Sequence, residues 1–360
     1  MNPAVDIYAD NPRLFLKALT RLYRRAVGFR LDLYRRGLLK TRTLPVRVIS
    51  VGNLTVGGTG KTPAVMMTAR ACLNRGLRPV ILSRGYRGRS GRITNIVSDG
   101  REVRLGPEMA GDEAFLLARQ LTGVPVLTGR DRYSLGLRAL SLFHPDLFIL
   151  DDGFQHLALA RRDNLLLLDA ARPWGNGFLL PAGALREPRS EARRATAFLL
   201  TRCTGGEAGL LRELRRDFPH RPIFLSRHRP VRLCSLAGTE VQDPGVLSRR
   251  RLLAFCGLAR PDFFRKTLLD LGAEVAGFIS WPDHHWPGPE DLRLIEDRAV
   301  ELDVRTVVTT AKDAVKLPGL WPEARSKIEV WVLEIEMEIL DGPDEYAAWL
   351  VSEWADSVES

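Results

Sequence analysis

The stretch SVGNLTVGGTGKTP, residues 50–63, decides the fold. It continues an apolar run rich in β-branched residues (44–53) and leads into a helix-forming run (63–77), which is the order strand, glycine loop, helix. The general phosphate-loop pattern G-x-x-x-x-G-K-[ST] fits from Gly60 onward, but Thr55 stands where its first glycine is expected. The stretch is therefore a nucleotide-binding loop with a variant start, or a tight turn with an incidental lysine. The strand–loop–helix context favours the nucleotide-binding loop.

The loop supplies each group that phosphate binding requires. Its glycines let backbone N–H groups turn toward an anion, and the following helix adds a favourable dipole. Lys61 can reach the β- and γ-phosphates, and the Thr62 hydroxyl can bind Mg²⁺. Pro63 falls in the first helical turn, where a missing N–H costs nothing. The residues expected to hold the nucleotide here are Thr55, Val56, Gly57, Gly58, Thr59, Gly60, Lys61 and Thr62.

The rest of the chain alternates short apolar strands with helical stretches. Further strands are expected at 78–86, 145–153, 164–170 and 196–203, and this alternation indicates an α/β fold with a parallel sheet covered by helices on both faces. Beyond about residue 220, two longer alternating strands (221–236 and 326–338) enclose a smaller α/β unit. We expect a P-loop NTPase-type domain over 43–220, a smaller α/β domain over 221–340 joined by extended strands, and a terminal helix over 341–360.

Residues 1–42 are strongly basic. Ten lysines and arginines lie between Arg13 and Arg42 against one acid, Asp32, in a chain whose net charge is +10. The apolar residues recur in steps of four and three, which places them on one helical stripe; they are Phe15, Leu19, Leu22, Ala26, Phe29 and Leu33. The helix could pack on its own domain with a solvated basic face, or lie on an anionic membrane surface. Nucleic acid is not an expected partner, because no reader motif or aromatic stacking module accompanies the charge.

Composition excludes several other classes. The four cysteines are scattered without a C-x-x-C pair, which argues against structural zinc or a disulfide framework and fits a reducing compartment. No run approaches the length needed to span a bilayer, and the N-terminus lacks the uninterrupted apolar core of a signal peptide.

Two acidic segments are candidates for the chemistry. ILDDG places Asp151 and Asp152 at the end of an expected strand, where a carboxylate can hold Mg²⁺ or simply form a turn. AGDEAFLLARQ places Asp112 and Glu113 before an apolar helix. Acids there can favour the helix dipole, or one of them can accept a proton from an attacking hydroxyl.

Several loops have both a functional interpretation and an ordinary structural one. WPDHHWP carries Asp283, His284 and His285, either as a solvated loop or with a histidine that tunes a carboxylate across an interdomain cleft. GRDRY and LPAGALREP carry arginines suited to phosphate, although a surface arginine is the default; they are Arg130, Arg132 and Arg186. TTAKDAVKL offers Lys312 and Asp313 without a clear role.

Taken in order, these motifs resemble one family, the tetraacyldisaccharide 4'-kinases of lipid A biosynthesis in Gram-negative bacteria. The resemblance runs from about residue 45 to 317 through GNLTVGGTGKTP, LSRGYRG, GDE, GRDR, LDDGFQH, GNGFLLPAGALREP, PDHH and KDAVKL. Two residues depart from the family pattern, Ala184 where proline is expected and Ala311 where glutamate is expected. In the resemblance Thr55 belongs to the longer pattern rather than marking a defective loop.

The resemblance implies transfer of the γ-phosphoryl group of ATP to the 4'-hydroxyl of tetraacyldisaccharide 1-phosphate, giving lipid IVA. It implies Asp112 as catalytic base assisted by His284, and Lys61 on the phosphates. Thr62, Glu113 and Asp151 would surround Mg²⁺. The site would be completed by Asp152, Gln155 and His156, with phosphate ligands Arg186 and one GRDR arginine, expected to be Arg130.

The implied acceptor carries four acyl chains and stays in a bilayer, which favours the membrane interpretation of the basic helix. It implies a peripheral enzyme at the cytoplasmic face of the bacterial inner membrane. Two other functions remain open: a nucleotide-driven switch that hydrolyses ATP or GTP, and a non-catalytic membrane binder with a degenerate nucleotide site. The intact lysine loop and acidic residues weigh against the second.

Overall fold

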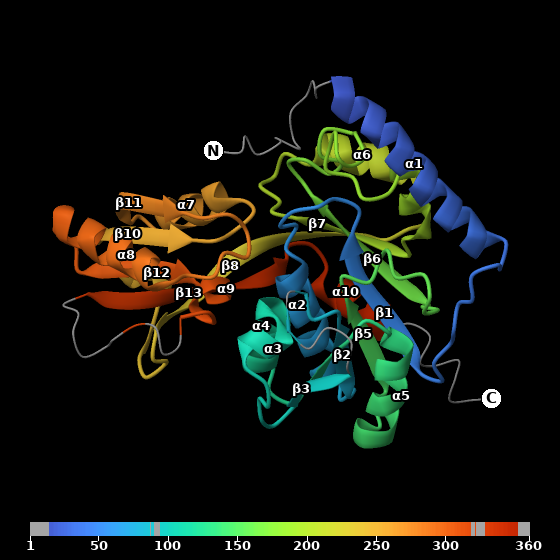
Figure 1. Cartoon of the computed structure of the whole chain (residues 1–360), viewed down its shortest axis with the longest axis horizontal. Coiled ribbons are helices and arrows are strands. Elements are labelled where there is room, and N and C mark those ends of the chain that lie inside the picture. The colour runs from blue at the N-terminus through green and yellow to red at the C-terminus, as the bar shows by residue number, and fades with distance from the viewer. Residues whose placement is uncertain (1–13, 87, 90–93, 318–320, 322–327, 352–360) are drawn as a thin grey trace.

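The protein folds into two lobes joined by a pair of long strands (Figure 1). The structure is a computed structural model that describes residues 14–351 except 87, 90–93, 318–320 and 322–327. The strand order is β11-β10-β12-β13-β8-β7-β6-β1-β5-β2-β4-β3, with β9 paired to β8. In this order the strands from β11 to β12 belong to the smaller lobe, together with β9, and the strands from β7 to β3 belong to the larger lobe.

The larger lobe contains the glycine loop. Its strands are β1 (Arg47–Asn53), β2 (Pro79–Ser83), β3 (Asn95–Asp99), β4 (Pro125–Thr128), β5 (Leu147–Asp151), β6 (Asp163–Asp169) and β7 (Ala197–Thr201). Its helices are α1 (Leu14–Arg35), α2 (Lys61–Leu73), α3 (Pro107–Ala110), α4 (Asp112–Gln120), α5 (Arg132–Phe143) and α6 (Ala208–Asp217). All the pairings among its strands are parallel except that of β3 with β4.

Helices cover both faces of the large sheet because its strands are apolar on both faces. In β1, for example, Ile49 and Val51 pack with α2 and α4 in one core cluster, whereas Val48 packs with α5 in another. This alternation along a strand is what the pleat produces. The predicted parallel α/β fold is confirmed, while the antiparallel edge strand β3 was not expected.

The smaller lobe repeats the α/β pattern. It comprises β9 (Val241–Gln242), β10 (Arg251–Cys256), β11 (Glu274–Ser280), β12 (Thr306–Thr310), α7 (Pro261–Asp270), α8 (Pro289–Glu301) and α9 (Ala311–Ala314). β10, β11 and β12 pair in parallel, and β12 pairs in parallel with β13 (Glu329–Ile339).

The two lobes are joined by β8 (Ile223–Ser235) and β13, which we call the ribbon. The start of β8 pairs with β7 of the larger lobe, and the rest pairs antiparallel with β13 from Ser226–Ile339 to Ser235–Trp331. The predicted connection by extended strands is therefore confirmed. The expected domain boundary at 220/221 falls just before β8.

The chain ends back on the larger lobe. In α10 (Pro343–Val351) the Tyr346 hydroxyl is 2.7 Å from the Thr68 hydroxyl of α2, and the Leu350 carbonyl accepts a 2.5 Å hydrogen bond from Arg47. The terminal helix was expected over 341–360, of which 352–360 lie outside the described residues.

The basic helix α1 lies along the outside of the larger lobe (Figure 1). Its buried residues are Leu16, Thr20 and Leu31, and the Tyr23 hydroxyl donates to the carbonyl oxygen of Arg186 at 2.8 Å. The apolar stripe points elsewhere, since Leu22 is 66% and Phe29 67% exposed. The helix thus packs on its own lobe through one face and leaves an apolar face uncovered. None of the helices in the described part of the chain combines the length and apolar character needed to cross a bilayer.

Candidate active site

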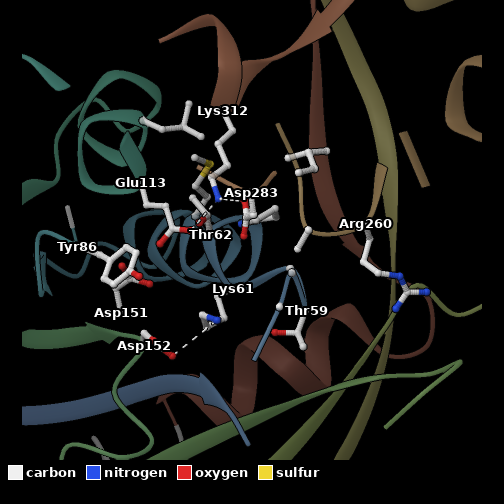
Figure 2. Close-up of a pocket in the computed structure, with 18 of the residues that line it drawn as sticks. Thr59, Lys61, Thr62, Tyr86, Glu113, Asp151, Asp152, Arg260, Asp283 and Lys312 are labelled. Carbon is white, nitrogen blue, oxygen red and sulfur yellow. Dashed lines mark hydrogen bonds and ion pairs between the residues drawn. The ribbon is translucent and has the colours of Figure 1, made fainter. Parts of the chain in front are cut away.

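A cavity of ≈ 940 Å³ opens at the carboxyl ends of the large sheet's central strands and is bounded by both lobes. This is where parallel α/β sheets place their ligand sites. The larger lobe contributes the glycine loop and the ends of β2 and β5, and the smaller lobe contributes the loops after β10, β11 and β12. Figure 2 shows Lys61, Asp152, Glu113 and Lys312 converging on this space.

The glycine loop has the geometry of a phosphate cradle. Gly57 and Gly60 have φ of 102° and 84°, which favour glycine, and α2 begins at Lys61 directly after the second of them. The Lys61 ammonium donates to Asn53 Oδ1 at 3.3 Å and lies 3.7 Å from Asp152 Oδ1. The lysine therefore points into the cavity, held between the ends of β1 and β5.

Thr55 and Val56 differ in position. Val56 lines the cavity with the residues from Gly57 to Thr62. Thr55 is buried behind the loop, where its carbonyl oxygen accepts hydrogen bonds from Asn53 at 2.8 Å and from Arg186 at 3.2 Å. In this structure Thr55 anchors the start of the loop.

Arg186 ties the aspartate pair to the loop. Its guanidinium donates to both carboxylate oxygens of Asp152 at 2.9 and 3.1 Å, to Gln155 Oε1 at 3.2 Å and to Asn53 Oδ1 at 2.5 Å. Burial alone would raise the pKa of Asp152, but the charges of Lys61 and Arg186 outweigh it and lower that pKa to about 2. Asp152 is therefore ionised at neutral pH, with a planar bidentate partner.

Asp151 is the carboxylate with the opposite shift. It is buried, and its Oδ2 accepts a 2.8 Å hydrogen bond from the Ser83 hydroxyl. Burial, followed by the charges of Glu113 and Asp152, raises the pKa of Asp151 to about 7. Carboxylates crowded into one place without enough positive charge fit a site that receives a cation.

The predicted magnesium residues come together around the cavity. Thr62, Glu113 and Asp151 all line it, from α2, α4 and β5. Among the described residues no group of three or more His, Cys, Asp or Glu side chains is arranged to hold a metal by itself. Mg²⁺ usually takes one or two carboxylates and completes its shell with water and substrate phosphates.

Asp112 and His284 meet although they lie on different lobes. Asp112 begins α4 and is 3% exposed, and its Oδ2 is 2.8 Å from His284 Nδ1. The other carboxylate oxygen accepts from the Glu113 backbone N–H at 2.9 Å. Burial would raise the pKa of Asp112, but the His284 hydrogen bond and the Lys312 charge outweigh it and lower that pKa to about 2.

The two GRDR arginines lie in different environments. Both line the cavity, but Arg130 is exposed whereas Arg132 is buried at 5% exposure. Burial lowers the pKa of Arg132, and the charge of Asp151 acts against that shift. His156 also lines the cavity, and burial together with the charges of Arg132 and Arg161 lowers its pKa to about 4.

Sequence reasoning missed two contributors and left a third without a role. Asn53 receives hydrogen bonds from both Lys61 and Arg186, and Ser83 orients Asp151. Both are small polar residues at strand ends, a signal too common to single them out. Lys312 contacts Glu113 of the larger lobe at 3.2 Å and Asp283 of its own lobe at 3.1 Å (Figure 2).

The sequence of this chain is similar to those of known proteins over nearly its whole length. The family model described as tetraacyldisaccharide-1-P 4'-kinase matches residues 12–354. A tetraacyldisaccharide 4'-kinase of Syntrophus aciditrophicus is 45% identical over 336 residues, covering 91% of this chain and 89% of the relative. Another, from Pelobacter propionicus, is 43% identical over 314 residues, covering 87% and 86%.

A solved structure agrees with the sequence comparisons. The crystal structure of LpxK from Aquifex aeolicus in complex with ATP superimposes with a TM-score of 0.71 and 36% identity, covering 93% of this chain and 96% of that chain. With the glycine loop, the acidic residues and the histidine loop assembled around one cavity, the chain belongs to the tetraacyldisaccharide-1-phosphate 4'-kinase family.

Proposed function

We propose that this protein is a kinase that transfers the γ-phosphoryl group of ATP to the 4'-hydroxyl of a tetraacyldisaccharide 1-phosphate. The observation that carries the proposal is the 2.8 Å contact between Asp112 and His284, which joins residues of the two lobes, with His284 lining the same cavity as the lysine loop. A hydrolase needs only to position water, whereas a carboxylate held between two lobes suits the hydroxyl of a large acceptor molecule.

The nucleotide would be held by the glycine loop, with Lys61 on its phosphates and Arg186 or Arg130 as further phosphate ligands. Thr62, Glu113 and Asp151 would hold Mg²⁺, which neutralises charge on the phosphates when bound. Asp152, Gln155 and Asn53 keep Lys61 and Arg186 in place through the contacts described above. The loop therefore provides positioning and positive charge, which are what phosphoryl transfer mainly requires.

Asp112 would accept the hydrogen of the acceptor hydroxyl. A carboxylate whose pKa is about 2 is a weak base, but a loose phosphoryl-transfer transition state needs little deprotonation of the nucleophile before the bond forms. Such a base can orient the hydroxyl and take the proton late, while His284 holds the carboxylate in place.

We propose further that α1 docks the enzyme on an anionic membrane surface. Its stripe Leu19, Leu22 and Phe29 is exposed, although the opposite side of the helix is packed on the larger lobe. An exposed apolar face flanked by lysines and arginines suits the interface between lipid headgroups and acyl chains. This would bring the cavity to an acceptor that stays in the bilayer.

The test is transfer of label from γ-labelled ATP to the disaccharide 1-phosphate in detergent micelles. The kinase proposal expects label in the lipid, dependent on both ATP and Mg²⁺. Label found only as free phosphate would favour the nucleotide switch instead. If neither labelled lipid nor labelled free phosphate forms, the protein is a non-catalytic binder.

A further inference from the structure

The cavity has an end that the proposed phosphate and magnesium residues do not use. Its lining there comes from the glycine loop, from Arg202 after β7, and from the start of α7 with the loop before it. The α7 side consists of Leu258, Ala259, Arg260, Phe263, Phe264 and Thr267. In Figure 2 Glu113 and Arg260 lie on opposite sides of Lys61.

The order of the strands indicates which part of ATP reaches this end. β1, which leads into the glycine loop, lies between β5 and β6, and β7 follows β6, with all these pairings parallel. Asp151 therefore lies on one side of the loop, and Asp169 and Arg202 lie on the other. In the proposed function the terminal phosphate of ATP lies with Mg²⁺ on the Asp151 side. The phosphates then run along the glycine loop, and the nucleoside emerges on the Arg202 side.

Three planar side chains form a stack at this end. The guanidinium carbon of Arg202 lies 4.3 Å from the centroid of the Phe263 ring, and that of Arg260 lies 4.6 Å from it. Arg202 is held in place, because it donates to the Gly58 carbonyl oxygen and to Asp169 and is only 11% exposed. Arg260 pairs with Asp169 at 3.5 Å and is 25% exposed. The guanidinium that a ligand in the cavity can reach more easily is therefore that of Arg260.

Such a stack suits a nucleobase. Bases stack on aromatic rings and on guanidinium planes, and an arginine that rests on an aromatic ring keeps its plane fixed. We propose that the base of ATP stacks on the guanidinium of Arg260, with Phe263 supporting that guanidinium and Arg202 acting as a positioning residue. This rests on the proposed function, which sets the direction of the nucleotide along the loop.

The test separates the base from the phosphates, and the plane of Arg260 from its charge. Binding of ATP and of inorganic tripolyphosphate, which has no nucleoside, is measured by titration calorimetry with Mg²⁺ and without lipid. Arg260→Lys keeps the charge and loses the plane, so it should weaken ATP binding at least about fivefold and tripolyphosphate binding less than about twofold. Arg260→Tyr keeps a plane and loses the charge, so it should bind ATP more tightly than Arg260→Lys.

A second variant tests the support under the guanidinium. Phe263→Leu removes the ring while Arg260 stays, and it should weaken ATP binding and leave tripolyphosphate binding unchanged. If Phe263→Leu does not fold, the two Arg260 variants still decide the question, because that side chain is partly exposed. The matched control is Arg265→Lys, the same exchange at an exposed arginine of α7, which should change the binding of neither ligand.

Three results would overturn the inference. Unchanged ATP binding in Arg260→Lys would place the base elsewhere. Equal losses for ATP and tripolyphosphate would make Arg260 a phosphate ligand, and weaker ATP binding in Arg260→Tyr than in Arg260→Lys would show that charge matters and stacking does not. A failure of the proposed function looks different, because the wild type would then transfer no label to lipid although its binding of ATP could still be measured.

Discussion

Arg186 shows how one side chain can hold a nucleotide site together. Its guanidinium grips both oxygens of Asp152 and also reaches Asn53 and Gln155, which no other cation geometry would allow at once. Asp152 itself has a φ of 49°, a conformation that costs energy and must be held by its surroundings. The arginine is therefore structural as well as a candidate phosphate ligand.

Replacing Arg186 by lysine should be costly although the charge is kept. A lysine cannot form the bidentate pair and leaves Asn53 or Gln155 unsatisfied, so we expect Arg186→Lys to lower the free energy of unfolding by about 1–3 kcal/mol. The loss in the free energy of unfolding is measured by denaturant unfolding of the variant and the wild type.

Arg78 provides the matched control. It also binds an aspartate through two nitrogens, Asp146 at 2.9 and 3.2 Å, but its side chain is 65% exposed. Arg78→Lys should cost much less than Arg186→Lys, because exposed ion pairs contribute little. Equal losses for the two variants would show that Arg186 has no special structural role.

Individual residues were predictable where the signal is local. The order β1, glycine loop, α2 follows from adjacent residues, so Lys61 and Thr62 could be placed from the sequence. The pairing of Asp112 with His284 spans 172 residues and that of Lys312 with Glu113 spans 199. Spacing gives no information on such contacts, so the resemblance alone suggested the first pair, and nothing suggested the second.

At the scale of elements, α1 was predictable as a helix but not in its orientation. The periodicity of Phe15, Leu19, Leu22 and Phe29 is that of a core-facing stripe, yet the structure leaves these residues exposed. The face that packs contains Thr20, Tyr23 and Arg30, which bond to carbonyl oxygens of the larger lobe. Polar contacts of this kind carry no periodic signal.

Negative charges introduced into the exposed stripe should therefore weaken binding to membranes without affecting folding. Leu22→Glu combined with Phe29→Glu should weaken sedimentation with anionic vesicles at least about tenfold, since burying each apolar side chain contributes about 1.5–3 kcal/mol. The free energy of unfolding should change by less than about 0.5 kcal/mol per site.

The matched control lies on α5. Leu137→Glu with Leu142→Glu changes two residues of similar type that are 45% and 49% exposed. It should leave sedimentation unchanged. A loss as large as that of the α1 variant would show that general charge, rather than α1, governs vesicle binding.

β8 carries a second testable feature, a histidine packed on the glycine loop. A Cβ added to Gly60 would lie 2.9 Å from His228 Nε2, so loop and ribbon are in close contact. Nε2 is buried and has no hydrogen-bond partner among the described residues. Burial, with a smaller contribution from the charge of Arg202, lowers the pKa of His228 to about 3.

His228 should make the protein less stable in mild acid. The unfolded histidine binds a proton below its ordinary pKa of 6.5, whereas the folded one binds it only near 3. The free energy of unfolding therefore falls as pH decreases from 6.5 toward 3, by about 2 kcal/mol at pH 5 from this residue. His228→Gln should remove that part of the pH dependence in thermal unfolding, and exposed His220→Gln should not. Parallel pH curves for His228→Gln and the wild type would contradict the account.

For the whole molecule, the ribbon links the parts of the site. α2, which begins at Lys61, carries Arg70 in its last turn, and Arg70 pairs with Glu336 of β13 at 2.5 Å. α4, which begins at Asp112, ends at Gln120, and the Gln120 side chain donates to Glu334 of the same strand at 2.6 Å. Both helices that carry site residues are thus fastened to the strand that positions the smaller lobe. Figure 1 shows α4 of the larger lobe close to α9 of the smaller one.

We expect Asp112 and His284, supplied by different lobes, to act as one unit in transfer to the lipid. The measurement is a double-mutant cycle on kcat with γ-labelled ATP and the disaccharide 1-phosphate, using Asp112→Asn, His284→Asn and both together. Asparagine suits position 284 because the residue there has a φ of 62°. ATP binding by the three variants is measured alongside.

We expect Asp112→Asn to lower kcat by about 10²- to 10⁴-fold while ATP still binds. Adding His284→Asn to it should lower kcat by less than about threefold more, because residues that act as a unit are not additive. Independent losses that multiply in the double variant, or a loss of ATP binding in Asp112→Asn, would contradict the claim.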